Sequence, residues 1–132
     1  MKNNINVAVV GLGQVGSYLL NELNIKKKDI ELKTGKKINV VAVSARNINK
    51  KRQFKIDKKI FFKNPLEIFN KKKVDILFEA IGQSDGISKK IVETALKNIT
   101  HWHRAWLAKE DMKQLCLDQI LQYSIAMQTK AL

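Results

Sequence analysis

Three glycines near the N-terminus have the spacing of a turn that binds dinucleotide phosphates. They lie in the segment Gly11-Leu12-Gly13-Gln14-Val15-Gly16. In such a turn the first glycine permits a tight bend, the second admits a pyrophosphate, and the third lets a helix pack against a strand. Free amides and the dipole at the helix N-terminus then stabilise phosphate charge. We predict cofactor contacts at Gly11, Leu12, Gly13, Gln14, Val15 and Gly16.

The residues on either side place this turn between a strand and a helix. Ile5–Val10 is a short apolar run rich in β-branched residues, which predicts a buried strand. Residues 14–24 repeat apolar side chains at helical spacing, so a helix follows the turn directly. The phosphate-binding chemistry demands this strand, turn and helix, and a purely topological role for the glycines is the weaker alternative.

The end of a second predicted strand, residues 38–44, bears on the choice of cofactor. NAD-specific sites usually place a carboxylate there to accept hydrogen bonds from the ribose 2′-hydroxyl. This sequence instead has Ser44-Ala45-Arg46, with further cations at Lys50, Lys51 and Arg52 and no acid nearby. A guanidinium can stack on adenine and pair with a 2′-phosphate. We expect contacts from Ser44 and Arg46 and favour NADP(H), with NAD(H), or a simple loop cation at Arg46, as alternatives.

A third main strand is predicted over Val74–Ile81 and closes at Gly82. Glu79 lies inside it, where a catalytic acid is possible, but such a residue more often orients the next loop or meets the cofactor ribose. We expect Ile81 and Gly82 to lie beside the nicotinamide, where glycine allows close approach.

The other segments complete an alternation of strands and helices. Residues 25–37 are charged and include Gly35, which predicts a helix end and an exposed connection, and residues 47–59 predict a surface loop. A minor strand at residues 60–62 and a short helix opened by Pro65 follow, and Ser84 or Asp85 can cap a helix with apolar positions from Ile87 to Ala95. This order predicts an α/β fold, an incomplete Rossmann-type parallel sheet with helices on both faces.

Composition narrows the classes of protein. The length of 132 residues suits about one domain, no apolar run approaches the ~18 residues of a membrane span, and the N-terminus lacks a signal peptide's apolar core. One cysteine, Cys116, excludes an internal disulfide, so we expect a cytoplasmic protein without a membrane partner. The net charge of +13 rests on scattered lysines with only three arginines, which favours solvated surface over a nucleic-acid face.

The composition changes near residue 100. The segment from there holds both tryptophans, both histidines and the cysteine, and none of the six glycines. We therefore divide the chain into a dinucleotide-binding domain over residues 1–99 and an atypical, helical tail over residues 100–132. A change of gene or reading frame near residue 100 is an equal alternative. His101 and His103 lack nearby partners for a metal site, so no metal is expected.

Four segments in order resemble successive blocks of homoserine dehydrogenase. They are Val7–Gly16, Val40–Arg46, Phe78–Gly82 and Ile91–Asn98, and the resemblance covers about residues 3–99. This family reduces aspartate 4-semialdehyde to homoserine with NADPH or NADH, on the route to threonine and methionine. The resemblance implies nucleotide binding at the glycine turn, contact of Arg46 with a 2′-phosphate or adenine, and nicotinamide-side contact at Ile81 and Gly82.

The resemblance is lost from about Thr100. Where the family has a Thr-Ala-Asn-Lys segment whose lysine serves the chemistry, this sequence reads Arg104-Ala105-Trp106-Leu107, and Lys109 is two residues off. The family's substrate-binding and dimer-forming domain has no counterpart in this sequence. We therefore assign no catalytic residue, and the oligomeric state stays open. The leading hypothesis is a truncated or frameshifted homoserine dehydrogenase that binds nucleotide without turnover. A small NAD(P) enzyme or subunit completed by a partner chain, and a basic nucleic-acid module, are the alternatives.

Overall fold

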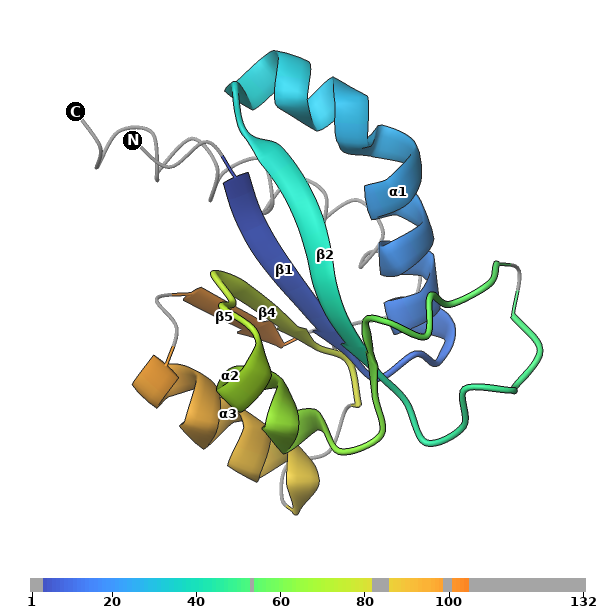
Figure 1. Cartoon of the computed structure of the whole chain (residues 1–132), viewed down its shortest axis with the longest axis vertical. Coiled ribbons are helices and arrows are strands. Elements are labelled where there is room, and N and C mark those ends of the chain that lie inside the picture. Colours follow the sequence, from blue (N-terminus) through green and yellow to red (C-terminus); the bar gives the residue numbers. More distant parts are fainter. Residues whose placement is uncertain (1–3, 53, 82–85, 99–100, 105–132) are drawn as a thin grey trace.

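The computed structural model describes residues 4–52, 54–81, 86–98 and 101–104, and Figure 1 shows their arrangement. The strands are β1 (Asn4–Val10), β2 (Lys37–Ser44), β3 (Phe61–Phe62), β4 (Ile76–Glu79) and β5 (His101–Arg104). The helices are α1 (Gln14–Thr34), a 3-10 turn η1 (Pro65–Glu67), α2 (Ile68–Lys71) and α3 (Ile87–Asn98). Within these ranges, no helix is long and apolar enough to cross a membrane.

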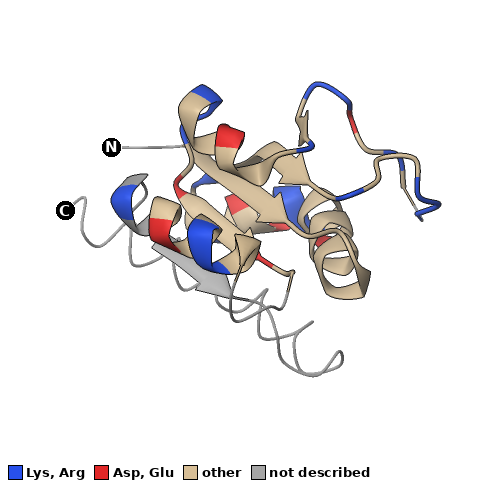
Figure 2. Ribbon diagram, turned by 90° about the horizontal axis from the view of Figure 1, so that it is seen from below, with Lys and Arg blue, Asp and Glu red and all other residues tan. Residues whose placement is uncertain are grey.

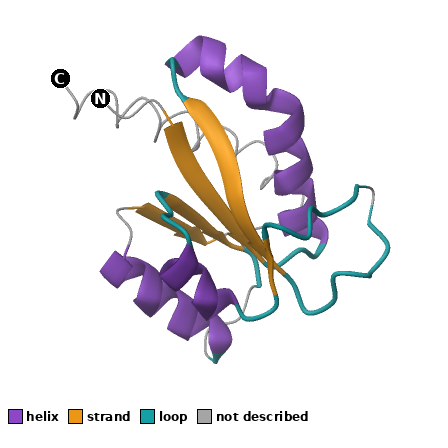
Figure 3. Ribbon diagram, viewed as in Figure 1, coloured by secondary structure: helices purple, strands orange, loops and turns teal. Residues whose placement is uncertain are grey.

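The strands form one parallel sheet in the order β3-β2-β1-β4-β5. Helix α1 covers one face, and α2 and α3 cover the other (Figure 3). The predicted α/β fold, a Rossmann-type parallel sheet with helices on both faces, is confirmed. The chain passes from β1 to β2 on one side and later to β4 on the other, so the winding direction reverses between β1 and β4.

Alternation along the strands supplies both cores, because successive side chains of a strand point to opposite faces. Ile5, Val7 and Val9 of β1 pack with α1, whereas Ala8 and Val10 pack on the face of α2 and α3. Each of these five side chains is at most 1% exposed. Strands covered on both faces read as continuous apolar runs, which is why the strand prediction from residues 5–10 succeeded.

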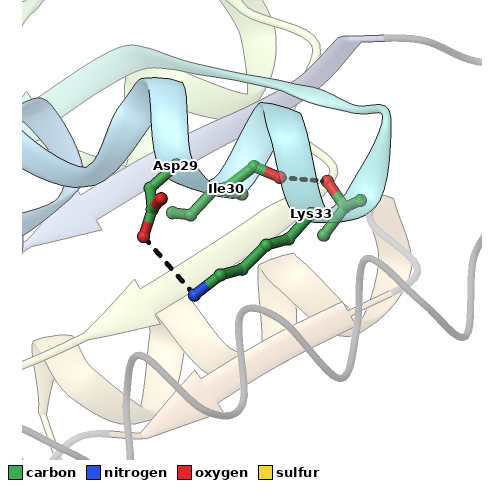
Figure 4. Close-up of polar contacts among 4 residues, drawn as sticks. Asp29, Ile30 and Lys33 are labelled. Carbon is green, nitrogen blue, oxygen red and sulfur yellow. Dashed lines mark hydrogen bonds and ion pairs between the residues drawn. The ribbon is translucent and has the colours of Figure 1, made fainter.

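Helix α1 is longer than the sequence indicated. The helix end predicted from Gly35 is confirmed, since Gly35 caps the helix with a left-handed φ of 70°. The exposed connection expected over residues 25–37 is wrong, because the helix continues to Thr34. Ile30 and Thr34 are buried, so the packed face continues. The Thr34 hydroxyl donates to the Ile30 carbonyl at 2.7 Å, and Lys33 pairs with Asp29 at 3.4 Å one turn earlier (Figure 4).

The tail begins differently from the expectation. His101–Arg104 form β5, a parallel neighbour of β4 with His101 level with Ile76, so the sheet extends past the boundary placed at residue 99. The prediction of a helix rested on the spacing of the tail's apolar residues. That spacing does not show the edge of β4, which offers hydrogen bonds to a further strand. Residues 105–132, Ser84 and Asp85 lie outside the described residues.

Candidate functional site

The carboxyl ends of β1, β2 and β4 meet at one edge of the sheet. The amide of Gly11, just after β1, donates to the Ser44 carbonyl at the end of β2 at 2.9 Å. The amide of Ala80, just after β4, donates to the Val10 carbonyl at 2.7 Å. Ligands of open α/β sheets bind outside the carboxyl ends of the strands, where the winding direction reverses. In this protein that position is the crevice between β1 and β4.

Two of the three glycines are required by the turn itself. Gly11 has a φ of +92°, and a Cβ there would lie 2.8 Å from the carbonyl carbon of Ala80 and from the amide nitrogen of Ile81. A Cβ on Gly16 would collide with the carbonyl oxygen of Gly11. Gly11 thus permits the bend against the end of β4, and Gly16 lets α1 begin directly against the turn.

Gly13 has a different environment. It is exposed, and a Cβ built on it would have no described atom within 4 Å, so the described fold leaves room for a side chain there. Gly13 is the N-cap of α1, where no side chain caps the helix and no acidic residue occupies the first turn. The Ser17 hydroxyl donates to the Leu12 carbonyl at 2.9 Å and holds the turn. The first amides of α1 therefore face a space that suits an anion.

A cavity of about 700 Å³ opens beside this turn. Its walls come from the glycine turn, from the segments that follow β2, β3 and β4, and from Ile87 at the start of α3. The charged residues of this lining are all cations: Arg46, Lys50, Arg52 and Lys63. No carboxylate lies among the described lining residues, so the cavity has the charge that a phosphorylated ligand requires.

Arg46 and Lys63 approach the cavity from two neighbouring strands. Ser44 at the end of β2 is level with Phe62 at the end of β3, so Arg46 and Lys63 follow these strand ends within two residues. Both side chains are exposed and both line the cavity. Sequence reasoning missed Lys63. The signal was present, because a parallel pairing of the minor strand with the second strand would have brought the two cations to one edge.

Ser44 and Arg52 act on the backbone in this structure. Ser44 is 2% exposed, and its carbonyl accepts the hydrogen bond from Gly11. The Arg52 guanidinium donates to the carbonyls of Asn47 at 2.9 Å, Ile48 at 3.2 Å and Lys50 at 3.2 Å, and reaches the Leu12 carbonyl at 3.5 Å. Arg52 therefore ties the loop after β2 to the glycine turn. Since these four bonds use most of its five N–H donors, Arg52 is less available to a ligand than Arg46 and Lys63.

On the β4 side, Glu79 is buried with 0% exposure. Its Oε1 accepts the amide of Ile81 at 2.8 Å and the hydroxyl of Ser88 at 3.3 Å. Of the roles considered for Glu79, orienting the following loop is the one these contacts show. Ile81, predicted to lie beside the nicotinamide, lines the cavity, while Gly82 lies outside the described residues.

Metal ligation finds no support in the described ranges, where no three His, Cys, Asp or Glu side chains gather at one point. Cys116 and the segment aligned with the family's lysine, from Ala105 to Leu107, lie outside those ranges. The described site is a cleft whose cations and helix N-terminus suit a phosphorylated ligand.

Comparisons with known proteins agree with this geometry. Residues 5–102 match the family model described as "Oxidoreductase family, NAD-binding Rossmann fold". A curated homoserine dehydrogenase of Neisseria gonorrhoeae is 31% identical over 97 residues, which are 74% of this chain and 22% of that protein.

Solved structures give the same result. A crystal structure of S. aureus homoserine dehydrogenase superposes with a TM-score of 0.70 at 29% identity, over 86% of this chain and 31% of that one. A homoserine dehydrogenase from Thiobacillus denitrificans, 23% identical, shares the fold with a TM-score of 0.67 over 94% of this chain and 27% of that one. The chain thus spans less than a third of the length of each of these relatives. It belongs to the oxidoreductase family with an NAD-binding Rossmann fold, and residues 5–102 form a homoserine dehydrogenase-like dinucleotide-binding domain.

Proposed function

We propose that this chain is the NADP(H)-binding domain of an oxidoreductase that reduces aspartate 4-semialdehyde to homoserine, on the route to threonine and methionine. One observation carries the proposal: a single cavity joins the glycine turn, the cations that follow β2 and β3, and Ile81 after β4. These three walls match the parts of a dinucleotide in order. The adenosine end would lie at β2, the pyrophosphate at the turn after β1, and the nicotinamide at β4.

The preference for NADP(H) rests on charge. Arg46 and Lys63 line the cavity on the side proposed for the adenosine end, where their charge would favour a ribose 2′-phosphate. The described lining holds no carboxylate that would accept a hydrogen bond from a 2′-hydroxyl instead. A hydrogen bond to a charged group is worth about 1.5–3 kcal/mol, which corresponds to roughly 10–100-fold in affinity. We therefore expect NADPH to bind at least about tenfold more tightly than NADH.

Bound NADPH supplies the hydride, and the residues of this domain bind and orient it. The backbone amides of the glycine turn would hold the pyrophosphate, and the backbone of Ile81 would limit the position of the nicotinamide. By resemblance to the family, the substrate and the proton donor belong to segments that match none of the described residues. The proposed contribution of this domain to the reaction is therefore the placement of the cofactor.

Reversal of charge at Arg46 tests the cofactor assignment. In Arg46→Glu the carboxylate would repel a 2′-phosphate and could accept a 2′-hydroxyl, so NADH should bind more tightly than NADPH in titration calorimetry. Lys59→Glu is the matched control, because it makes the same change of charge at an exposed residue outside the cavity lining. The control should keep the preference for NADPH. Equal affinities of the unmodified chain for NADPH and NADH would contradict the assignment.

A further inference from the structure

Glu79 is a buried carboxyl that the proposed cofactor contacts do not use. It lies at the end of β4 with 0% exposure, and Ser88, which donates to it, is also 0% exposed. Removing a carboxylate from water is costly unless hydrogen bonds compensate it. The two donors to its Oε1 come from different elements, since Ile81 follows β4 and Ser88 lies in the first turn of α3. The carboxyl therefore links the end of β4 to the first turn of α3.

The link acts on the wall of the cavity. The Ile81 amide that Glu79 holds is the same atom that would lie 2.8 Å from a Cβ on Gly11, so the backbones of Ile81 and Gly11 are packed against each other. Ile81 and Ile87, the residue before Ser88, both line the cavity. The hydrogen bonds that Glu79 accepts from Ile81 and Ser88 thus fix residues next to, or within, the β4 side of the cavity, whereas Arg46 and Lys63 follow β2 and β3.

We propose that Glu79 is a positioning residue for the nicotinamide half of the cofactor. By holding the Ile81 amide and the start of α3, it fixes the wall against which the nicotinamide and its ribose lie. The adenosine half, on the side of β2 and β3, does not depend on it. This inference rests on the proposed binding of NADP(H). It assigns Glu79 to the nicotinamide half of the cleft, and Arg46 and Lys63 to the adenosine half.

The experiment compares two ligands on the full 132-residue chain. NADPH carries both halves, whereas adenosine 2′,5′-bisphosphate carries only the adenosine half. Glu79→Leu removes the acceptor and keeps the side chain's approximate volume, and should weaken NADPH about tenfold while changing the bisphosphate less than about twofold. Glu79→Gln keeps an oxygen at the same place and should restore NADPH affinity to within about threefold. Thr34→Val, which removes a buried hydroxyl bond at the far end of α1, is the control and should change neither affinity.

Each result is decisive. Equal weakening of both ligands by Glu79→Leu, or no weakening of NADPH, overturns the positioning role and leaves the proposed function intact. Failure of the unmodified chain to bind either ligand overturns the proposed function itself. If Glu79→Leu does not fold, Ser88→Ala replaces it, because it removes one of the two donors to Oε1. That variant should weaken NADPH about threefold and leave the bisphosphate unchanged, and equal effects on the two ligands would again contradict the proposal.

Discussion

At the scale of single residues, the three glycines of the motif differ in what surrounds them, and therefore in what would prevent a side chain at each position. Gly11 and Gly16 are demanded by neighbouring backbone atoms, whereas no described atom lies near a side chain built at Gly13. Among the described residues nothing requires Gly13 to lack a side chain, so a loss of function on substitution there would point to a bound ligand. This distinction makes Gly13 the residue at which ligand binding and folding can be separated.

Gly13→Val should abolish NADPH binding and leave the circular dichroism spectrum and melting temperature close to those of the unmodified chain. The added side chain would enter the space proposed for the pyrophosphate, and its Cβ would have no described atom within 4 Å. Gly16→Val is the contrasting variant, because its Cβ collides with the Gly11 carbonyl, and it should lower the melting temperature or prevent folding. A Gly13→Val chain that binds NADPH as before would show that the turn is only topological.

The sequence predicted which residues line the cavity where local chemistry decides their position, and missed residues whose position depends on the sheet. The glycine turn follows from the order of strand, turn and helix, and Arg46 follows from the end of a recognisable strand. Lys63 was missed because its place depends on the pairing of β3 with β2. The role of Arg52 in the loop was not predicted, because the carbonyls that it contacts come together only in the folded loop.

At the scale of elements, the loop between β2 and β3 carries Arg46 and is held by Arg52. Arg52→Lys keeps the charge but replaces the planar set of five donors by one ammonium, which cannot reach all of the same carbonyls. We expect this variant to weaken NADPH and NADH by the same factor, about three- to tenfold, because it loosens the loop without removing the 2′-phosphate contact.

Calorimetry with both cofactors checks this expectation, and Lys51→Arg serves as a control of similar size in the same loop. Loss of NADPH affinity alone would instead make Arg52 a direct ligand of the 2′-phosphate. No effect on either cofactor would mean that the contacts of Arg52 with the loop do not shape the cavity.

The helices and strands were predicted where burial has a clear period. Helix α3 was expected from apolar residues that the structure places in the core, including Ile91 and Ala95. The second half of α1 was missed because exposed Ile25 and Leu32 and a run of lysines obscure the period, although Ile30 continues the buried face. Strand β5 was missed because its partner, β4, is distant in sequence.

At the scale of the whole molecule, the charge of +13 is distributed over helices and loops (Figure 2). The cavity takes only a few of these cations. A lysine-rich surface around a phosphate-binding cleft is the arrangement that we propose, and a nucleic-acid module is the alternative that a binding test separates from it.

The 132-residue chain should show no homoserine dehydrogenase activity at saturating NADPH and aspartate semialdehyde. Hydride transfer needs cofactor and aldehyde held together, and such positioning is worth about 7–11 kcal/mol of the barrier. The chain corresponds to 22% of a homoserine dehydrogenase, and its described residues account for the cofactor alone. Absorbance at 340 nm checks this, with a complete homoserine dehydrogenase as positive control. Semialdehyde-dependent NADPH oxidation by the pure chain would contradict the prediction, and activity only after a second subunit is added would favour a partner-completed enzyme.

The central claim is that a dinucleotide occupies the cleft at the carboxyl ends of β1, β2 and β4. The most direct test is titration of the purified chain with NADPH in the presence of excess duplex DNA. The account predicts saturable binding of one NADPH per chain, unaffected by DNA and lost in Gly13→Val. Absence of NADPH binding would contradict the proposed dinucleotide site. An NADPH signal that DNA displaces with steep dependence on salt would also contradict it, and would support a nucleic-acid module instead.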